Sequence, residues 1–160
     1  MPLKELNIPE ASRGPLIALL NDRLADAIDL ALQAKQAHWN VKGPNFIALH
    51  ELFDKVAEAA QEHADVIAER AVILSGIAEG TIQAVQRRSQ LPPYSLTVQD
   101  WRAHVEAVAN ALATFGNAIR DAIDRADELG DADTADLFTG VSRDTDKNHW
   151  FVSAHLRGGG

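Results

Sequence analysis

The residues between 50 and 69 carry two stripes of opposite character, each at the spacing of an α-helix. The polar stripe recurs at steps of three and four and comprises His50, Asp54, Glu58, Gln61, Asp65 and Glu69. The apolar stripe has the same spacing and comprises Phe46, Leu49, Phe53, Val56, Ala60, Ile67, Ala71 and Leu74. Side chains three and four positions apart share one face of a helix. The pattern therefore predicts a long amphipathic helix whose apolar face packs into a core.

The polar stripe is symmetric about its own centre. Two copies of this helix packed antiparallel would place Asp54 of one chain opposite Asp65 of the other, and His50 opposite Glu69. Within one chain, Asp54 and Asp65 are separated by about 16 Å at a rise of about 1.5 Å per residue, which is too far for a shared metal ion. These side chains can therefore act together only across a dimer. The alternative interpretation is an ordinary solvated helix face.

The composition limits the class of protein. A chain of 160 residues suits one domain, 1–160, and the absence of cysteine excludes disulfides, thiolate metal sites and cysteine nucleophiles. The net charge of −8 argues against a generally basic nucleic-acid-binding surface and is compatible with attraction of cations. Because the chain has no apolar run of about 18 residues and no apolar signal core near its start, we expect a soluble, cytoplasmic protein without membrane contact.

Helix breakers divide the chain into four long helical segments. After an extended lead-in over residues 1–11, helices are expected at 12–40, 46–75 and 101–129, and a last helix runs from 131 to a short glycine tail at 158–160. The long connection from 78 to 96 contains a short helix at 81–88, and its length suits two helices that run in the same direction. We therefore predict an all-α fold, a ferritin-like four-helix bundle with a short extra helix between the second and third helices.

The predicted helix ends rest on familiar signals. Gly76 and Gly130 are expected to terminate the second and third long helices. The pattern Thr97-x-x-Asp100 resembles the start signal of the third.

The chemistry of a metal site depends on which donors the bundle supplies. Many such bundles hold two irons within one subunit through Glu-x-x-His pairs. The chain contains no Glu-x-x-His, so this kind of di-iron site is disfavoured. The remaining candidate ligands are His38, His50, Asp54, Asp65 and Glu69. Two imidazoles and three carboxylates suit Fe(II), with Mn(II) and Zn(II) as competitors, although a histidine at position 38 is by itself more often a core or interface residue.

Two segments of the chain resemble a known family. Residues 35–71, with Trp39-Asn40 and Ala68-Glu69-Arg70 beside the candidate ligands, closely resemble the signature of the Dps miniferritins. Residues 131–156 resemble the last helix of the same family. The resemblance covers nearly the whole chain, and five ligand types at matching spacings make it specific.

The resemblance implies a function and a site. It implies a ferroxidase centre at a two-fold interface, where one subunit supplies His38, His50 and Asp54 and its neighbour supplies Asp65 and Glu69 to a two-metal iron site. It also implies twelve subunits around a hollow shell. Fe(II) would be oxidised there, preferentially by hydrogen peroxide, and stored as ferric mineral, which would protect the cell from oxidative stress.

Other residues have two interpretations each. By resemblance, Trp39 would donate an electron near the site, whereas it would otherwise anchor the dimer interface. Asp133 and Asp136 would line an iron-entry pore by resemblance, or cap the last helix. Trp150 is expected to pack. We assign structural or surface positions to the remaining histidines, which are His63, His104, His149 and His155.

Two further functions remain open from the sequence. A DNA-compacting stress protein is suggested by the family name, but the family's Lys- and Arg-rich extensions are absent here, since only Arg157 precedes the terminal glycines. We therefore do not expect DNA binding to be the main role. The other alternative is an interaction bundle whose metal site is vestigial.

Overall fold

The computed structural model describes residues 1–157 and is built from α-helices. In chain order these are α1 (Glu10–Asn40), α2 (Phe46–Ile73), α3 (Ile82–Arg88), α4 (Trp101–Glu128) and α5 (Ala132–Ser153), followed by a 3-10 turn at Ala154–Leu156. No strand occurs among the described residues. The predicted all-α fold is confirmed, and α3 is the short extra helix expected between the second and third long helices.

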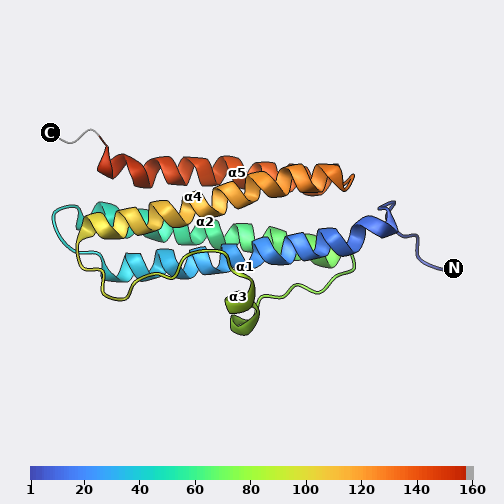
Figure 1. The fold of residues 1–160 in the computed structure, drawn as a ribbon, viewed down its shortest axis with the longest axis horizontal. Helices are drawn as coiled ribbons and strands as arrows, with labels where there is room; N and C mark the ends of the chain where they lie inside the picture. Colours follow the sequence, from blue (N-terminus) through green and yellow to red (C-terminus); the bar gives the residue numbers. More distant parts are fainter. Residues whose placement is uncertain (158–160) are drawn as a thin grey trace.

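The four long helices form a bundle of two antiparallel pairs. α1 packs along α2, and α4 packs along α5. After α2 the chain runs back past α1 through α3 and enters α4 at the opposite end of the bundle (Figure 1). α2 and α4 therefore run in the same direction, as the length of the connection predicted.

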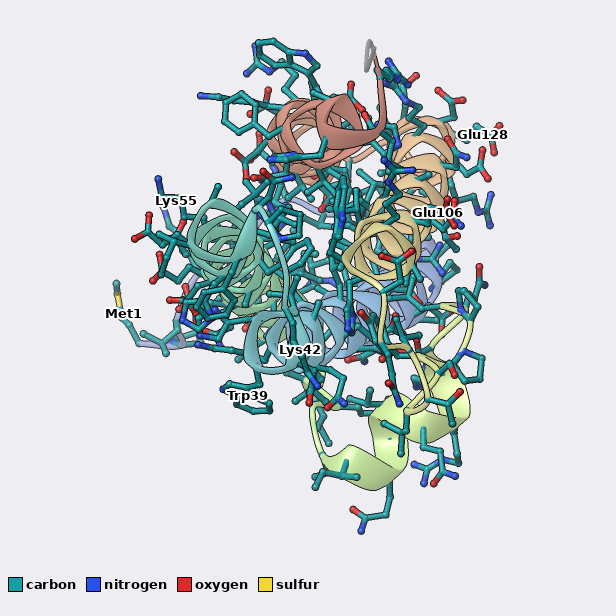
Figure 2. The ribbon with its side chains drawn as sticks, turned by 90° about the vertical axis from the view of Figure 1, so that its left-hand side faces the viewer. Met1, Trp39, Lys42, Lys55, Glu106 and Glu128 are labelled. Carbon is teal, nitrogen blue, oxygen red and sulfur yellow. The ribbon has the colours of Figure 1, made fainter. Side chains whose placement is uncertain are left out.

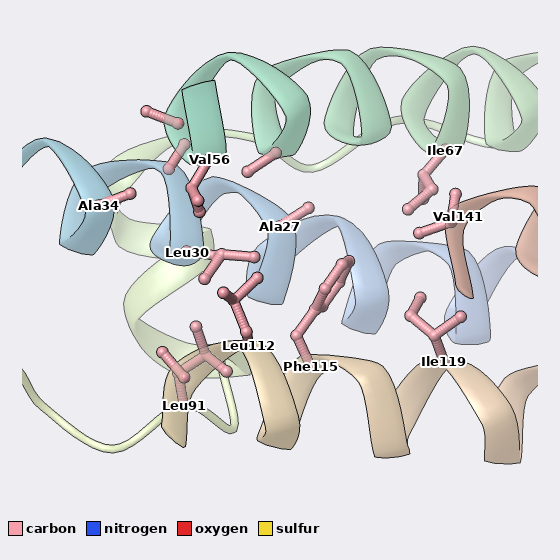
Figure 3. Close-up of a cluster of buried hydrophobic side chains, with 14 of the residues drawn as sticks. Ala27, Leu30, Ala34, Val56, Ile67, Leu91, Leu112, Phe115, Ile119 and Val141 are labelled. Atoms are coloured by element: carbon pink, nitrogen blue, oxygen red, sulfur yellow. The ribbon is translucent and has the colours of Figure 1, made fainter. Parts of the chain in front are cut away.

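The centre of the bundle is filled by apolar side chains from all four long helices. Figure 3 shows Leu30 of α1, Val56 of α2, Phe115 of α4 and Val141 of α5 in one buried cluster. Full burial of each large apolar side chain stabilises the fold by about 1.5–3 kcal/mol. The apolar stripe predicted for α2 is buried except at Phe46, which begins the helix and is 39% exposed.

Ser75 and Gly76 close the C-terminal end of α2. Ser75, rather than the expected glycine, has the left-handed conformation, with φ of 70°. The amides of Ser75 and Gly76 donate to the carbonyls of Val72 and Ala71, both at 2.9 Å, which satisfies the last turn. A Cβ at Gly76 would lie 2.6 Å from Cγ2 of Ile17. Glycine is therefore required for space and not for its backbone freedom.

The starts of two helices differ in detail from the prediction. α1 begins at Glu10, two residues earlier than expected. The cap of α4 is Asp100, whose side chain accepts the amide of Arg102 at 3.3 Å. Thr97 bonds instead to Ser95, with 2.9 Å between the two hydroxyl oxygens, so the predicted role of Thr97 in the start signal is wrong.

The last helix also ends earlier than predicted. α5 stops at Ser153, and the 3-10 turn that follows ends at Leu156. The predicted glycine tail at 158–160 lies outside the described residues. Within the part of the chain that is described, no helix is long and apolar enough to cross a membrane.

The long connection between α2 and α4 is held against a polar face of α1 by side-chain hydrogen bonds. Asn21 donates to the carbonyl of Ile77 and accepts the amide of Glu79, both at 2.9 Å. Asp26, which is fully buried, accepts the amide of Gln90 at 2.7 Å. Because backbone groups on both sides of α3 are held in this way, the short helix has a fixed place beside α1.

Candidate metal centre

His38 near the end of α1 and His50 in the first turns of α2 face each other across the antiparallel helix pair. Their rings stack with centroids 3.7 Å apart and an interplanar angle of 19°. Nδ1 of His38 lies 2.6 Å from the carbonyl oxygen of His50, and Nδ1 of His50 lies 2.7 Å from the carbonyl oxygen of His38. A carbonyl only accepts, so each Nδ1 carries a hydrogen and each Nε2 keeps its lone pair in the neutral ring. Metal-binding histidines are held in this way by their second nitrogen.

Asp54 lies one helical turn after His50 and supplies a carboxylate to the same cluster. Its Oδ1 accepts a hydrogen bond from the ammonium group of Lys35, which lies one turn before His38 on α1. This hydrogen bond lowers the pKa of Asp54, and the charge of Lys35 adds to the effect against a desolvation that opposes it. Asp54 is therefore an ionised candidate ligand at neutral pH, and Lys35 is the neighbour that the sequence reasoning missed. Its position three residues before His38, on the same face of α1, was the available signal.

Asp65 and Glu69 form a second cluster further along α2, one turn apart on its exposed face. Hydrogen bonding and charge repulsion from Asp65 raise the pKa of Glu69. A cation between the two carboxylates would relieve this repulsion. Asp65 also lies at the edge of a groove of about 420 Å³ between α1 and α2, lined mainly by apolar residues that include Leu24, Ile28, Leu32 and Ala68.

The five predicted ligands thus occupy two separate clusters. His38 and His50 stack on each other, with Asp54 one turn after His50. Asp65 and Glu69 form a second pair, and Asp65 lies about 16 Å from Asp54 along α2, as the helical rise requires. Among residues 1–157, no three His, Asp or Glu side chains lie close enough to hold a metal ion by themselves. Each cluster offers donors that suit Fe(II), but neither is a complete site within one chain.

Trp39 and Trp150 both lie on the surface. Trp39 is 66% exposed and projects away from the bundle (Figure 2), so its role beside His38 stays a prediction. Trp150 is 61% exposed on α5. The expectation that Trp150 packs is therefore wrong within one chain.

Asp133 and Asp136 lie exposed in the first turns of α5. The residue that caps this helix is Asp131, which accepts the amide of Thr134 at 3.4 Å. Capping by Asp133 or Asp136 is therefore wrong, and their place in an iron-entry pore stays a prediction.

Asp131 also joins the first turn of α5 to the end of α2. Nη2 of Arg70 lies 3.1 Å from Oδ1 and 2.9 Å from Oδ2 of Asp131, and Nε of Arg70 donates to Oγ1 of Thr134 at 3.0 Å. Burial alone would raise the pKa of Asp131, but the hydrogen bonds from Thr134 and Arg70 outweigh it and lower the pKa. Arg70 is the residue after Glu69, so this network fixes the turn of α2 that carries Glu69.

Two histidines assigned to structural positions have specific partners. Nε2 of His63 on α2 lies 2.8 Å from Oδ2 of Asp144 on α5, and burial lowers the pKa of His63 even though Asp144 favours the charged form. His104 is fully buried beside Tyr94, whose hydroxyl reaches its Nδ1. Burial lowers the pKa of His104 as well. Both side chains join separate segments of the bundle, which agrees with a structural role.

Comparisons with known proteins place the fold in a family. The chain matches the family model of the ferritin-like domain over residues 17–158. It is 46% identical over 151 residues to the DNA protection during starvation protein of Agrobacterium fabrum (strain C58), with 94% of this chain and 93% of that protein covered.

Two solved structures are similar over almost their whole length. DpsA14 from Streptomyces coelicolor superposes with a TM-score of 0.90 at 37% identity, covering 95% of this chain and 90% of that one. Mycobacterium smegmatis Dps gives a TM-score of 0.91 at 30% identity, covering 99% of this chain and 96% of that one. The matches agree in fold, length and sequence, and the chain belongs to the Dps family of ferritin-like proteins.

Proposed function

We propose that this protein is a ferroxidase and iron store, which oxidises Fe(II) at sites shared between two subunits and keeps the ferric product inside a hollow shell. The observation that carries the proposal is the pair of stacked imidazoles His38 and His50. Each ring is held through Nδ1, which leaves Nε2 as the nitrogen that could bind a metal ion, and Asp54 lies one helical turn after His50. Family membership supports iron as the metal, and the donor set agrees with it.

The shared site follows from the separation of the two clusters. An antiparallel partner helix would bring its Asp65 and Glu69 to the His38, His50 and Asp54 cluster, and the second site would form by symmetry. The apolar groove beside Asp65 gives such a partner a surface to cover. A closed interface would also exclude water from the oxidation step, which strengthens the binding of the metal by the carboxylates.

The oxidation itself is a transfer of electrons from bound Fe(II) to a peroxide. One hydrogen peroxide accepts two electrons and two protons, so two Fe(II) ions, each losing one electron, can reduce it to two molecules of water without release of hydroxyl radical. The ferric product then leaves for the cavity of the shell, which we propose contains twelve subunits. Native mass spectrometry of the assembled protein should give the mass of twelve chains, and a dimer alone would contradict the shell.

Single substitutions test the site. Asp65→Ala and Glu69→Ala are expected to suppress peroxide-driven Fe(II) oxidation, followed by stopped-flow absorbance of the ferric product. Glu58→Ala is the matched control because Glu58 is exposed on the same polar stripe but belongs to neither cluster. Unchanged initial rates in Asp65→Ala and Glu69→Ala would refute the assignment.

A mixing experiment tests whether the site is shared. A dimer of one His38→Ala chain and one Glu69→Ala chain keeps one intact site, so a random mixture should recover about a quarter of the wild-type sites. A mixture of His38→Ala with Asp54→Ala is the control, because both changes damage the same half and no intact site can form. Absence of recovery in verified mixed dimers would place the site within one chain.

DNA protection is the second candidate function, because the relative from Agrobacterium fabrum carries that name. The described N-terminus gives it little support. Its residues 1–9 carry Lys4 and Glu5, and Arg13 is occupied by the carbonyls of Leu74 and Leu6, both at 3.2 Å. We expect no retardation of duplex DNA by the purified assembly at low salt without bridging cations. A shifted band would favour direct DNA binding.

A further inference from the structure

Lys35 and Asp54 form a second cross-helix contact beside the stacked histidines. α1 and α2 are antiparallel, and Lys35 precedes His38 by one turn while Asp54 follows His50 by one turn. The pairs His38 with His50 and Lys35 with Asp54 are therefore successive contacts between the same two helices. The ammonium of Lys35 therefore donates a hydrogen bond to Asp54, a carboxylate that is also a proposed iron ligand.

The charges at a shared site favour one divalent ion while Lys35 is in place. Asp54 and the partner subunit's Asp65 and Glu69 would supply three negative charges, and Lys35 supplies one positive charge. One divalent ion neutralises the remainder. A second ion would leave two uncompensated positive charges in a partly dehydrated interface, which is strongly unfavourable. Displacement of Lys35 removes one of them and frees Oδ1 of Asp54.

We propose that the ammonium of Lys35 is a built-in cation of the iron site, which holds Asp54 so that each site binds one divalent ion tightly and a second only after Lys35 has moved away. This inference rests on the proposed function, since it concerns the same site. Lys35 is then a positioning and selectivity residue that controls how many ions the site holds.

The surroundings of Lys35 allow this movement. The side chains of Lys35 and Asp54 are 31% and 33% exposed in the single chain, so the ammonium lies at the edge of the cluster and is not enclosed by residues of its own chain. Lysine has a flexible four-carbon stem and binds as a point charge, without the bidentate geometry of arginine. The two histidines, in contrast, are each fixed by a hydrogen bond to backbone and keep their place when Lys35 moves.

Anaerobic titration of the assembled apo-protein with Zn(II), followed by calorimetry, tests the proposal without any oxidation step. The wild type should bind one Zn(II) per chain tightly and a second one weakly. Lys35→Met should bind the second ion about tenfold more tightly or better, because the competing charge is gone. Lys35→Arg, which keeps the charge, should retain the wild-type pattern and also guards against a loss caused by altered folding.

Lys55→Met is the matched control for the change in net charge. Lys55 follows Asp54 directly but is exposed and points away from the bundle (Figure 2). Lys55→Met should leave the affinities for the first and the second Zn(II) ion at their wild-type values. Equal affinity for the second ion in the wild type, Lys35→Met and Lys35→Arg would overturn the role of Lys35 alone. Absence of tight Zn(II) binding to the wild type would overturn the proposed iron site itself.

Discussion

The side chain of Asp131 both caps α5 and pairs with Arg70, so its replacement should strongly lower the free energy of unfolding. Asp131→Ala removes the cap of α5, which is worth about 1 kcal/mol. It also leaves the guanidinium of Arg70 without its carboxylate, although the side chains of Arg70 and Asp131 are only 13% and 8% exposed. Loss of one partner of a buried ion pair costs about 3–5 kcal/mol. Arg70 keeps its hydrogen bond to Thr134, so we take the lower end and expect a loss of about 4 kcal/mol in the free energy of unfolding.

Urea unfolding followed by far-UV circular dichroism measures this loss. Wild type and variant are compared at the same chain concentration, because assembly contributes to the apparent stability. Asp133→Ala is the control, since Asp133 lies two residues away and is exposed, and its change should stay within about 0.5 kcal/mol.

The pH dependence gives a second measurement of the same contact. The folded-state pKa of Asp131 is lowered, so its stabilisation is present above the unfolded pKa near 4 and is lost as the pH falls through the folded value. The difference between wild type and Asp131→Ala should therefore shrink below about pH 4. Equal unfolding midpoints for Asp131→Ala and Asp133→Ala at pH 7 would show that the contact between Arg70 and Asp131 does not stabilise the fold.

Two further predictions concern the packing of α2. Burial lowers the pKa of His63 in the folded state, so the stabilisation by neutral His63 is present above the unfolded pKa near 6.5 and is lost as the pH falls. His63→Gln should therefore flatten the loss of stability between about pH 7 and 5, measured by thermal unfolding. An unchanged slope would contradict this. Gly76→Ala should lower the free energy of unfolding by about 1–3 kcal/mol, because the new Cβ would collide with Ile17. Ser75→Gly should be nearly neutral, since relief of the left-handed conformation offsets a more flexible unfolded chain. Equal effects at the two positions would show that the collision does not matter.

The sequence alone predicted the helices and their order. The apolar stripe of α2 predicted which side chains enter the core, because a helix places residues three and four apart on one face. The length of the connection predicted the parallel α2 and α4. The helical rise separates Asp54 from Asp65, and this separation by itself limits a shared metal site to two chains.

Contacts between residues of different helices became known only from the packed structure. Periodicity assigns a residue to a face of its own helix, but it leaves open the axial shift and rotation between two helices, which the packing of the whole core sets. The contacts of His38 with His50, Lys35 with Asp54, Arg70 with Asp131 and His63 with Asp144 all depend on that shift and rotation. The polar stripe of α2 thus identified candidate ligands, and the packing of α1 against it decided that one of them already holds a lysine.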